Sequence, residues 1–274
     1  MAKFKTGLNT SRNADEMRSV EVEIDFTSNA LASILYRQGE TVVLACCTME
    51  ARLPGWFPRD SNKGWVHAEY SLLPGSTDSR FRRERRGAKG RTQEIERLVA
   101  RSLRAAVDLE ELGPIALNVD CDILNADGGT RCASITAANL ALRLGVRRLI
   151  SAGICLPQNM RPTEEQRRSG WSAPVLSEKD KKAHEMRVMP HDVAAISVGL
   201  IDGKSYLDLD YNLDSNADVD MNVVKVSDGS FVEVQGTGEE ATYQREELDA
   251  LLDMADIGFS SLFEMQKSIL DGQE

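Results

Sequence analysis

Residues 117–144 read L-N-V-D-C-D-I-L-N-A-D-G-G-T-R-C-A-S-I-T-A-A-N-L-A-L-R-L. The first part, Leu117 to Leu124, alternates apolar and polar side chains, which is typical of a β-strand. The pair Gly128-Gly129 then predicts a tight turn, and the residues from about Arg131 to Leu144 predict a helix. In a strand, glycine turn and helix of this kind, backbone N–H groups can approach an anion closely.

The residues before this unit predict an antiparallel sheet followed by a helix. Residues 20–48 alternate and turn at Gly39-Glu40, and Trp65 to Leu73 forms a further strand candidate that ends at Pro74-Gly75. From Thr92 to about Leu109 apolar residues recur at helical spacing, with charged residues elsewhere on the helix surface.

The last third of the chain repeats the order of strands and then a helix. Two hairpins are predicted there, followed by one long helix that closes the chain. The predicted strands are Val193 to Ile201 and Ser205 to Tyr211, joined at Asp202-Gly203-Lys204, and Met221 to Val226 and Phe231 to Gln235, joined at Asp228-Gly229; the helix runs from about Tyr243 to Leu270.

Strand blocks followed by helices, twice over, indicate an α+β sandwich with two βα halves and helices packed on the sheets. We expect one domain over residues 1–274. The stretch from Gly145 to Pro190 is polar, weakly patterned and interrupted by prolines. It is therefore expected to be a surface excursion that carries one short helix.

The overall charge and its distribution point in different directions. A net charge of −10 argues, by itself, against a nucleic-acid partner. Between Arg80 and Arg91, however, the chain reads R-F-R-R-E-R-R-G-A-K-G-R, with seven basic residues and one acid. A concentrated basic strip on an acidic protein favours local contact with phosphate groups.

Other compositional features limit the class of protein. With 42% hydrophobic and 28% charged residues the chain is an ordinary globular protein, and no apolar run is long enough to span a membrane. The start, Met1-Ala2-Lys3-Phe4-Lys5, does not resemble a signal peptide, so a cytoplasmic location is expected. The five cysteines form no Cys-x-x-Cys pair and are interpreted as buried, reduced thiols, and the three histidines are too scattered to predict a metal site.

Two predicted helices begin in ways that suit an anion. Gly90-Arg91-Thr92 opens the first helix, with Thr92 as a candidate cap, and Gly128-Gly129-Thr130-Arg131 opens the second. Arginines at two helix starts are suited to binding one phosphate from two sides. The alternative for either motif alone is a tight turn whose arginine pairs with a neighbouring carboxylate.

An acidic cluster completes the set of candidate residues. From Asp208 to Asp220 the chain holds five aspartates, of which Asp214 and Asp220 lie six residues apart across an expected loop. Carboxylates, waters and a substrate phosphate are the ligands that Mg²⁺ prefers. The alternative is a solvated acidic loop. A calcium loop at residues 120–128 is excluded because Leu124 and Asn125 occupy positions that need an oxygen ligand and a glycine.

Several long blocks resemble the ribonuclease PH family, in that family's order and spacing. The similarity runs from about Arg12 to Lys267, while the first ten residues have no counterpart and residues 145–190 exceed the usual length. The blocks are G-R-T-Q-E-I-E-R-L (90–98), D-C-D-I-L-N-A-D-G-G-T-R-C-A-S-I-T (120–136), D-V-D-M-N-V-V (218–224) with V-E-V-Q-G-T (232–237), and G-W-V-H-A-E-Y-S-L-L-P-G (64–75).

The resemblance implies a ribosomal protein S5 domain 2-like sandwich and a role for each of the candidate residues. Arg91, Gly129, Thr130 and Arg131 fall where the family binds inorganic phosphate. Asp214 and Asp220 match its catalytic carboxylate pair, which binds Mg²⁺ and helps to protonate the leaving 3′-oxygen. The family's RNA-contacting loop corresponds to Arg80, Arg82, Arg83, Arg85 and Arg86.

The activity implied by the resemblance is phosphate-dependent 3′-to-5′ removal of nucleotides from RNA, with tRNA precursors as the expected substrate. Orthophosphate is the co-substrate, nucleoside diphosphates are released, and the reaction is reversible. A homohexamer built as a trimer of dimers is also implied. The alternatives are a silent, RNA-binding ring subunit, which would lack a signature arginine or aspartate, and a metal-dependent phosphoester hydrolase.

Overall fold

The first sheet is built from the alternating segments of the N-terminal half. The structure is a computed structural model that describes residues 12–50, 52–58, 61–238 and 241–273. The strands pair in the order β1-β2-β3-β5-β4, and only β4 and β5 run parallel. Their bounds are β1 Val20–Ile24, β2 Ala32–Gln38, β3 Thr41–Glu50, β4 Trp65–Leu72 and β5 Ala116–Asn125.

The second sheet is antiparallel throughout, in the order β7-β6-β8-β9. The predicted turn between β6 and β7 is confirmed: Asp202 and Gly203 have φ angles of 50° and 75°, the left-handed pair that a tight hairpin requires. The bounds are β6 Val193–Ile201, β7 Lys204–Leu207, β8 Val219–Val226 and β9 Phe231–Gly238.

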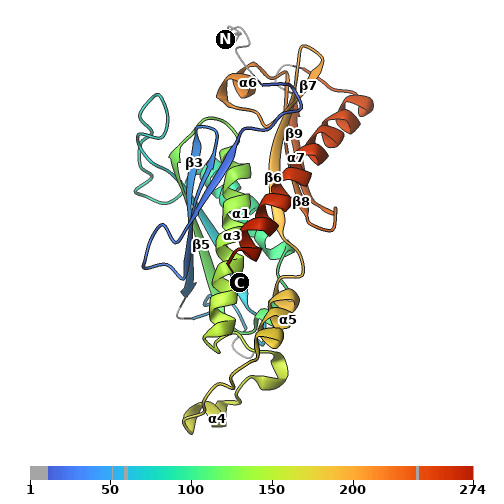
Figure 1. Ribbon diagram of the computed structural model, residues 1–274. Helices are drawn as coiled ribbons and strands as arrows, with labels where there is room; N and C mark the ends of the chain where they lie inside the picture. The colour runs from blue at the N-terminus through green and yellow to red at the C-terminus, as the bar shows by residue number, and fades with distance from the viewer. Residues whose placement is uncertain (1–11, 51, 59–60, 239–240, 274) are drawn as a thin grey trace.

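Three helices connect and cover the sheets (Figure 1). Helix α3 (Thr130–Ser151) lies between them, packing on β2 and β3 of the first sheet and on β6 of the second. Helix α1 (Gly90–Ala105) packs on β4 and on α3, and α7 (Arg245–Asp271) packs on β6 and β7. The predicted α+β arrangement of two halves with helices on the sheets is therefore confirmed.

The predicted end of the central helix at Leu144 is wrong, because α3 continues to Ser151. Gly145 does not interrupt it. A side chain at this position would come within 2.9 Å of the Cys47 sulfur, so the glycine permits close packing of the helix on β3.

Residues 145–190 are consequently not one surface excursion with a single short helix. The excursion begins after Ser151 and contains η1 (Gln158–Met160), α4 (Glu164–Arg168) and α5 (Glu178–Val188). Helix α5 packs on α3, and its buried Glu185 accepts hydrogen bonds from Arg143 and Arg147 of that helix. Only the part around α4 extends away from the body (Figure 1).

Other predicted boundaries also shift. The first helix ends at Ala105 rather than near Leu109, where the separate short helix α2 (Leu109–Leu112) begins. The strand predicted to reach Tyr211 ends at Leu207, since Asp208 has a φ of 54° and turns into the core. The residues that follow form helix α6 (Tyr211–Asn216), where a loop was expected.

The expectation of reduced thiols is confirmed: the five cysteines are free, four of them buried and Cys46 partly so. Among the described residues, no helix is both long enough and apolar enough to cross a bilayer. The first eleven residues lie outside the part of the chain that the structure describes, so the expectations about the start of the chain stay predictions.

Candidate active site

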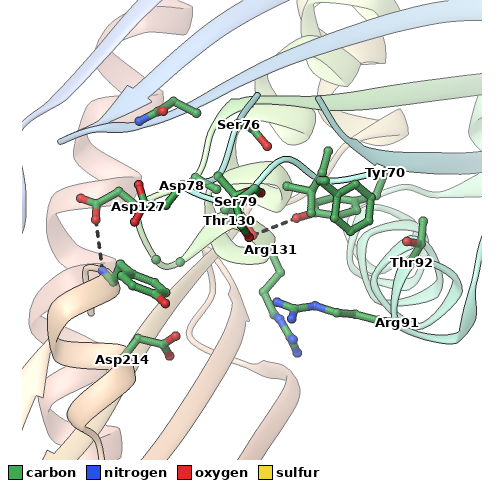
Figure 2. A pocket seen from close by; sticks show the side chains of 18 of the residues that line it. Tyr70, Ser76, Asp78, Ser79, Arg91, Thr92, Asp127, Thr130, Arg131 and Asp214 are labelled. Atoms are coloured by element: carbon green, nitrogen blue, oxygen red, sulfur yellow. Dashed lines mark hydrogen bonds between the residues drawn. The ribbon is translucent and has the colours of Figure 1, made fainter. Parts of the chain in front are cut away.

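A pocket of about 980 Å³ lies where the two halves meet (Figure 2). Its walls come from β4, the loop after it, α1, the turn before α3, α6 and β8. The pocket brings together the sequence-predicted phosphate-binding and carboxylate residues: Arg91, Gly129, Thr130, Arg131, Asp214 and Asp220.

The glycine turn at the floor of this pocket requires both of its glycines. Gly128 and Gly129 have φ angles of 73° and 64°, which disfavour any other residue. A side chain on Gly128 would also come within 2.4 Å of the Leu209 carbonyl oxygen. The turn therefore packs directly against the segment that leads into α6, and this contact fixes α6 relative to the start of α3.

Thr130, the first residue of α3, is held by Tyr70 of β4. The two hydroxyl oxygens are 2.9 Å apart, and Tyr70 is 4% exposed. Burial raises the pKa of Tyr70, although the positive charges of Arg91 and Arg131 act to lower it. A neutral phenol at this place orients the Thr130 hydroxyl and adds no negative charge to an anion site.

The N-terminal ends of helices α1 and α3 keep the partial positive charge of the helix dipole. Neither has an acidic residue in its first turn, whereas α2, α5 and α7 all do. Acidic residues normally offset the partial positive charge of a helix start, so α1 and α3 leave that charge available to a bound anion. The predicted cap at Thr92 is wrong: α1 begins at Gly90, and its N-cap is Lys89, which makes no side-chain hydrogen bond there.

Arg91 and Arg131 extend toward each other from these two helices (Figure 2). Arg91 is exposed, and within the described ranges its side chain makes no hydrogen bond and no ion pair. Arg131 is 20% exposed and donates through Nη1 to the side-chain oxygen of Gln235 at 2.7 Å. Two guanidinium groups at adjacent helix starts are chemically suited to a dianion.

The carboxylate pair lies on the second half of the molecule. Asp214 is on α6 and Asp220 on β8, where Asp220 pairs with Gly199 of β6. Both line the pocket, but in the residues that the structure describes no group of three or more His, Cys, Asp or Glu side chains is arranged to hold a metal. Two hard oxygen donors, completed by waters and a substrate phosphate, fit Mg²⁺.

A buried ion pair behind the turn was not predicted from the sequence. Arg18 donates to both carboxylate oxygens of Asp208, at 3.0 and 2.6 Å, and to the Asp127 carbonyl oxygen at 2.5 Å. Burial opposes ionisation of Asp208, yet the hydrogen bonds and charge of Arg18 outweigh it and lower the Asp208 pKa. The pair connects the segment before β1, the glycine turn and the segment before α6, so it braces the pocket from behind.

The basic strip is divided between the pocket and its surroundings. Arg80 and Arg82 line the pocket, while Arg83, Arg85 and Arg86 are exposed and do not. The charge of Arg83 acts on Asp122 of β5, where it opposes the larger upward shift that burial produces in the Asp122 pKa. Arg83 thus lies outside the pocket, within electrostatic reach of β5.

The chain matches two family models in sequence. These are "3′ exoribonuclease family, domain 1" over residues 16–145 and "3′ exoribonuclease family, domain 2" over residues 191–258. Ribonuclease PH of Rhodopirellula baltica is 44% identical over 268 residues, 97% of this chain and 99% of that protein. Ribonuclease PH of Corynebacterium diphtheriae is 45% identical over 262 residues, 95% of this chain and 96% of that protein.

Solved structures with the same fold include rice Rrp46 and an archaeal exosome. Rice Rrp46 aligns with a TM-score of 0.68 at 15% identity, covering 95% of this chain and 98% of that one. The Archaeoglobus fulgidus exosome with RNA bound to the active site aligns with a TM-score of 0.65 at 21% identity, covering 89% and 86%. These distant neighbours support the assignment of the fold.

Proposed function

Since the chain belongs to the 3′ exoribonuclease family, we propose that it is a phosphate-dependent 3′-to-5′ exoribonuclease whose active site is the pocket between its two halves. One observation carries the proposal. Arg91 and Arg131, from two helix starts far apart in the sequence, meet in the same pocket as Asp214 and Asp220. That combination suits phosphoryl transfer to an inorganic phosphate.

Each residue has a defined task in this reaction. Arg91, Arg131, the Thr130 hydroxyl and the Gly129 amide hold orthophosphate, and the two arginines offset its repulsion from the RNA backbone. A phosphate oxygen attacks the phosphorus of the last phosphodiester. The bond from that phosphorus to the 3′-oxygen of the preceding nucleotide breaks, and the oxygen takes a proton to become the new RNA end.

The released nucleoside diphosphate carries its α-phosphate from the RNA and its β-phosphate from orthophosphate. One phosphoester linkage is exchanged for a phosphoanhydride of comparable energy, so the reaction should reverse when diphosphates are abundant. Asp214 and Asp220 would hold Mg²⁺, which would supply a counter-charge for the leaving 3′-oxygen. We also assign to this pair the delivery of the proton to that oxygen.

The RNA body is proposed to follow the basic strip, with Arg80 and Arg82 at the pocket and Arg83, Arg85 and Arg86 beyond it. tRNA precursors are the proposed substrates and a homohexamer, a trimer of dimers, the proposed assembly. Both stay predictions, as does the cytoplasmic location.

A silent, RNA-binding ring subunit is the second candidate. It would need no intact phosphate site, yet both arginines, the glycine turn and both aspartates are present and line one pocket. A hydrolase that uses water is the third candidate, but a hydrolase has no attacking phosphate for the second arginine to bind.

Chromatography of the released nucleotide separates these functions. We expect an RNA with a single-stranded 3′ end, incubated with the protein and Mg²⁺, to yield nucleoside diphosphates only when orthophosphate is added. Monophosphates without phosphate would indicate a hydrolase, and no product under either condition would indicate a silent subunit.

A further inference from the structure

A three-residue contact at the edge of the pocket joins helices α1 and α3 to strand β9. Gln235 of β9 accepts a hydrogen bond from Arg131 Nη1 at 2.7 Å, and its amide nitrogen donates to Glu94 Oε1 of α1 at 2.9 Å. Glu94 Oε1 is also 3.4 Å from Arg131 Nη1. Neither Gln235 nor Glu94 is among the pocket-lining residues, so both act on the pocket only through Arg131.

The carboxylate of Glu94 determines which way the Gln235 amide faces. An amide side chain can present either its oxygen or its nitrogen to a neighbour, whereas an ionised carboxylate can only accept hydrogen bonds. Glu94 therefore selects the orientation in which the Gln235 nitrogen faces α1 and the Gln235 oxygen faces Arg131. An amide turned the other way would present N–H groups to a guanidinium, which can only donate.

The contact restrains Arg131 and leaves most of its donors available. Both of its contacts are made through Nη1, and within the described ranges no hydrogen bond is made by Nη2 or Nε. These N–H groups form the planar fork that binds two phosphate oxygens at once. A guanidinium held at one corner also loses less conformational freedom when the anion binds.

We infer that Gln235 is a positioning residue for the phosphate nucleophile: it holds the Arg131 guanidinium beside Arg91, and Glu94 fixes the orientation of the Gln235 amide. The inference rests on the proposed function, because it assigns to Arg131 the binding of orthophosphate. It predicts a defect specific to phosphate, since the contact does not include the residues proposed to bind RNA.

The chain offers a matched control for a merely structural role. Arg101 and Glu233 form a second tie between α1 and β9, with 2.8 Å between Nη2 and Oε2, and neither residue contacts Arg131. Glu233→Ala therefore weakens the junction of helix and strand without releasing the guanidinium. Any effect of that junction on activity or stability should appear in this variant as well.

The test measures orthophosphate binding and phosphate saturation in wild type, Gln235→Ala, Glu94→Ala, Glu94→Gln and Glu233→Ala. Binding is followed without RNA, as the rise in melting temperature when inorganic phosphate is added. We expect Gln235→Ala to raise both the dissociation constant and the KM for phosphate by about tenfold, the factor set by about 1.4 kcal/mol. The KM for RNA should stay within twofold of wild type.

The remaining variants decide the role of Glu94. Glu94→Ala should weaken phosphate binding severalfold, because the amide loses its preferred orientation. Glu94→Gln keeps an acceptor for the Gln235 nitrogen but can also turn an N–H group toward it, so its phosphate binding should fall between that of wild type and that of Glu94→Ala. Glu233→Ala should leave phosphate binding unchanged.

Wild-type phosphate affinity in Gln235→Ala, or an equal loss in Glu233→Ala, would overturn the inference. So would equal increases in the KM values for RNA and phosphate. If the proposed function is wrong, the wild-type protein releases no nucleoside diphosphate. The thermal measurement would still report, in that case, whether Gln235 affects phosphate binding.

Discussion

Replacement of Arg91 by alanine should separate catalysis from stability. Arg91 is exposed, and its side chain makes no hydrogen bond or ion pair within the described part of the chain, so folding gains nothing from its charge. Surface changes of this kind alter stability by about 0.5 kcal/mol or less, and the melting temperature should move by about 2 °C at most.

The expected loss of activity is large by comparison. If the Arg91 guanidinium donates two hydrogen bonds to orthophosphate, each worth about 1.5–3 kcal/mol, its removal costs about 3–6 kcal/mol of binding in the transition state. That corresponds to a fall of about 10²- to 10⁴-fold in kcat/KM for phosphate.

The assay is the initial rate of nucleoside diphosphate release at varied phosphate, together with RNA binding and thermal unfolding of the same preparation. Arg97→Ala, also an exposed arginine of α1 but not a lining residue of the pocket, is the matched control. Normal turnover by Arg91→Ala would refute the assignment. A drop in melting temperature large enough to explain the lost activity would show that the Arg91 side chain contributes to folding.

The other predictions concern the carboxylates, the basic strip and the first sheet. Asp220→Asn should abolish phosphorolysis but leave RNA binding in the absence of Mg²⁺ unchanged; normal turnover would remove Asp220 from the active site. We expect a variant with alanine at Arg82, Arg83, Arg85 and Arg86 to bind RNA more weakly. The slope of log affinity against log salt concentration should fall in magnitude by up to about 3, because fewer counterions are released. An unchanged slope would show that the strip does not contact RNA. Burial, with the charges of Glu69 and Asp122, raises the pKa of Asp120 from 3.8 to about 6. Because the pKa of Asp120 is higher in the folded state than in the unfolded state, its ionisation destabilises the fold as pH rises from about 4 to above 6. Asp120→Asn should therefore stabilise the protein at pH 7.5, by about 1 kcal/mol or less after solvent screening. The gain should be much smaller at pH 4. Equal effects at both pH values in thermal melts, or the same gain from the exposed Asp253→Asn, would contradict the pKa argument.

Local patterns predicted the elements that carry the site. The alternation in Leu117 to Leu124, the Gly128-Gly129 pair and the helical residues after it correspond to β5, the turn and α3. Such features depend on neighbours in the chain, so a single sequence reveals them. The end of α3 was not predictable in this way, because Gly145 is explained by its contact with Cys47 of β3, which is distant in the sequence.

The parts of the site that were missed depend on contacts across the fold. Arg18 and Asp208 are 190 positions apart, and nothing in their local sequence marks them as partners. Gln235 lies in one of the blocks that resemble the ribonuclease PH family, yet only the structure shows its oxygen facing Arg131. The convergence of Arg91 with Asp214 likewise depends on how the two halves pack, which the resemblance implied and hydrophobic periodicity did not.

We propose that orthophosphate is the attacking group, and the fate of labelled phosphate distinguishes this from attack by water. The protein would be incubated with RNA, Mg²⁺ and ³²P-orthophosphate, and the nucleotides separated and degraded to locate the label. We expect the label to appear in the β-phosphate of the released nucleoside diphosphate, with one label for each nucleotide removed. Shortening of the RNA while all of the label remains in orthophosphate would contradict it.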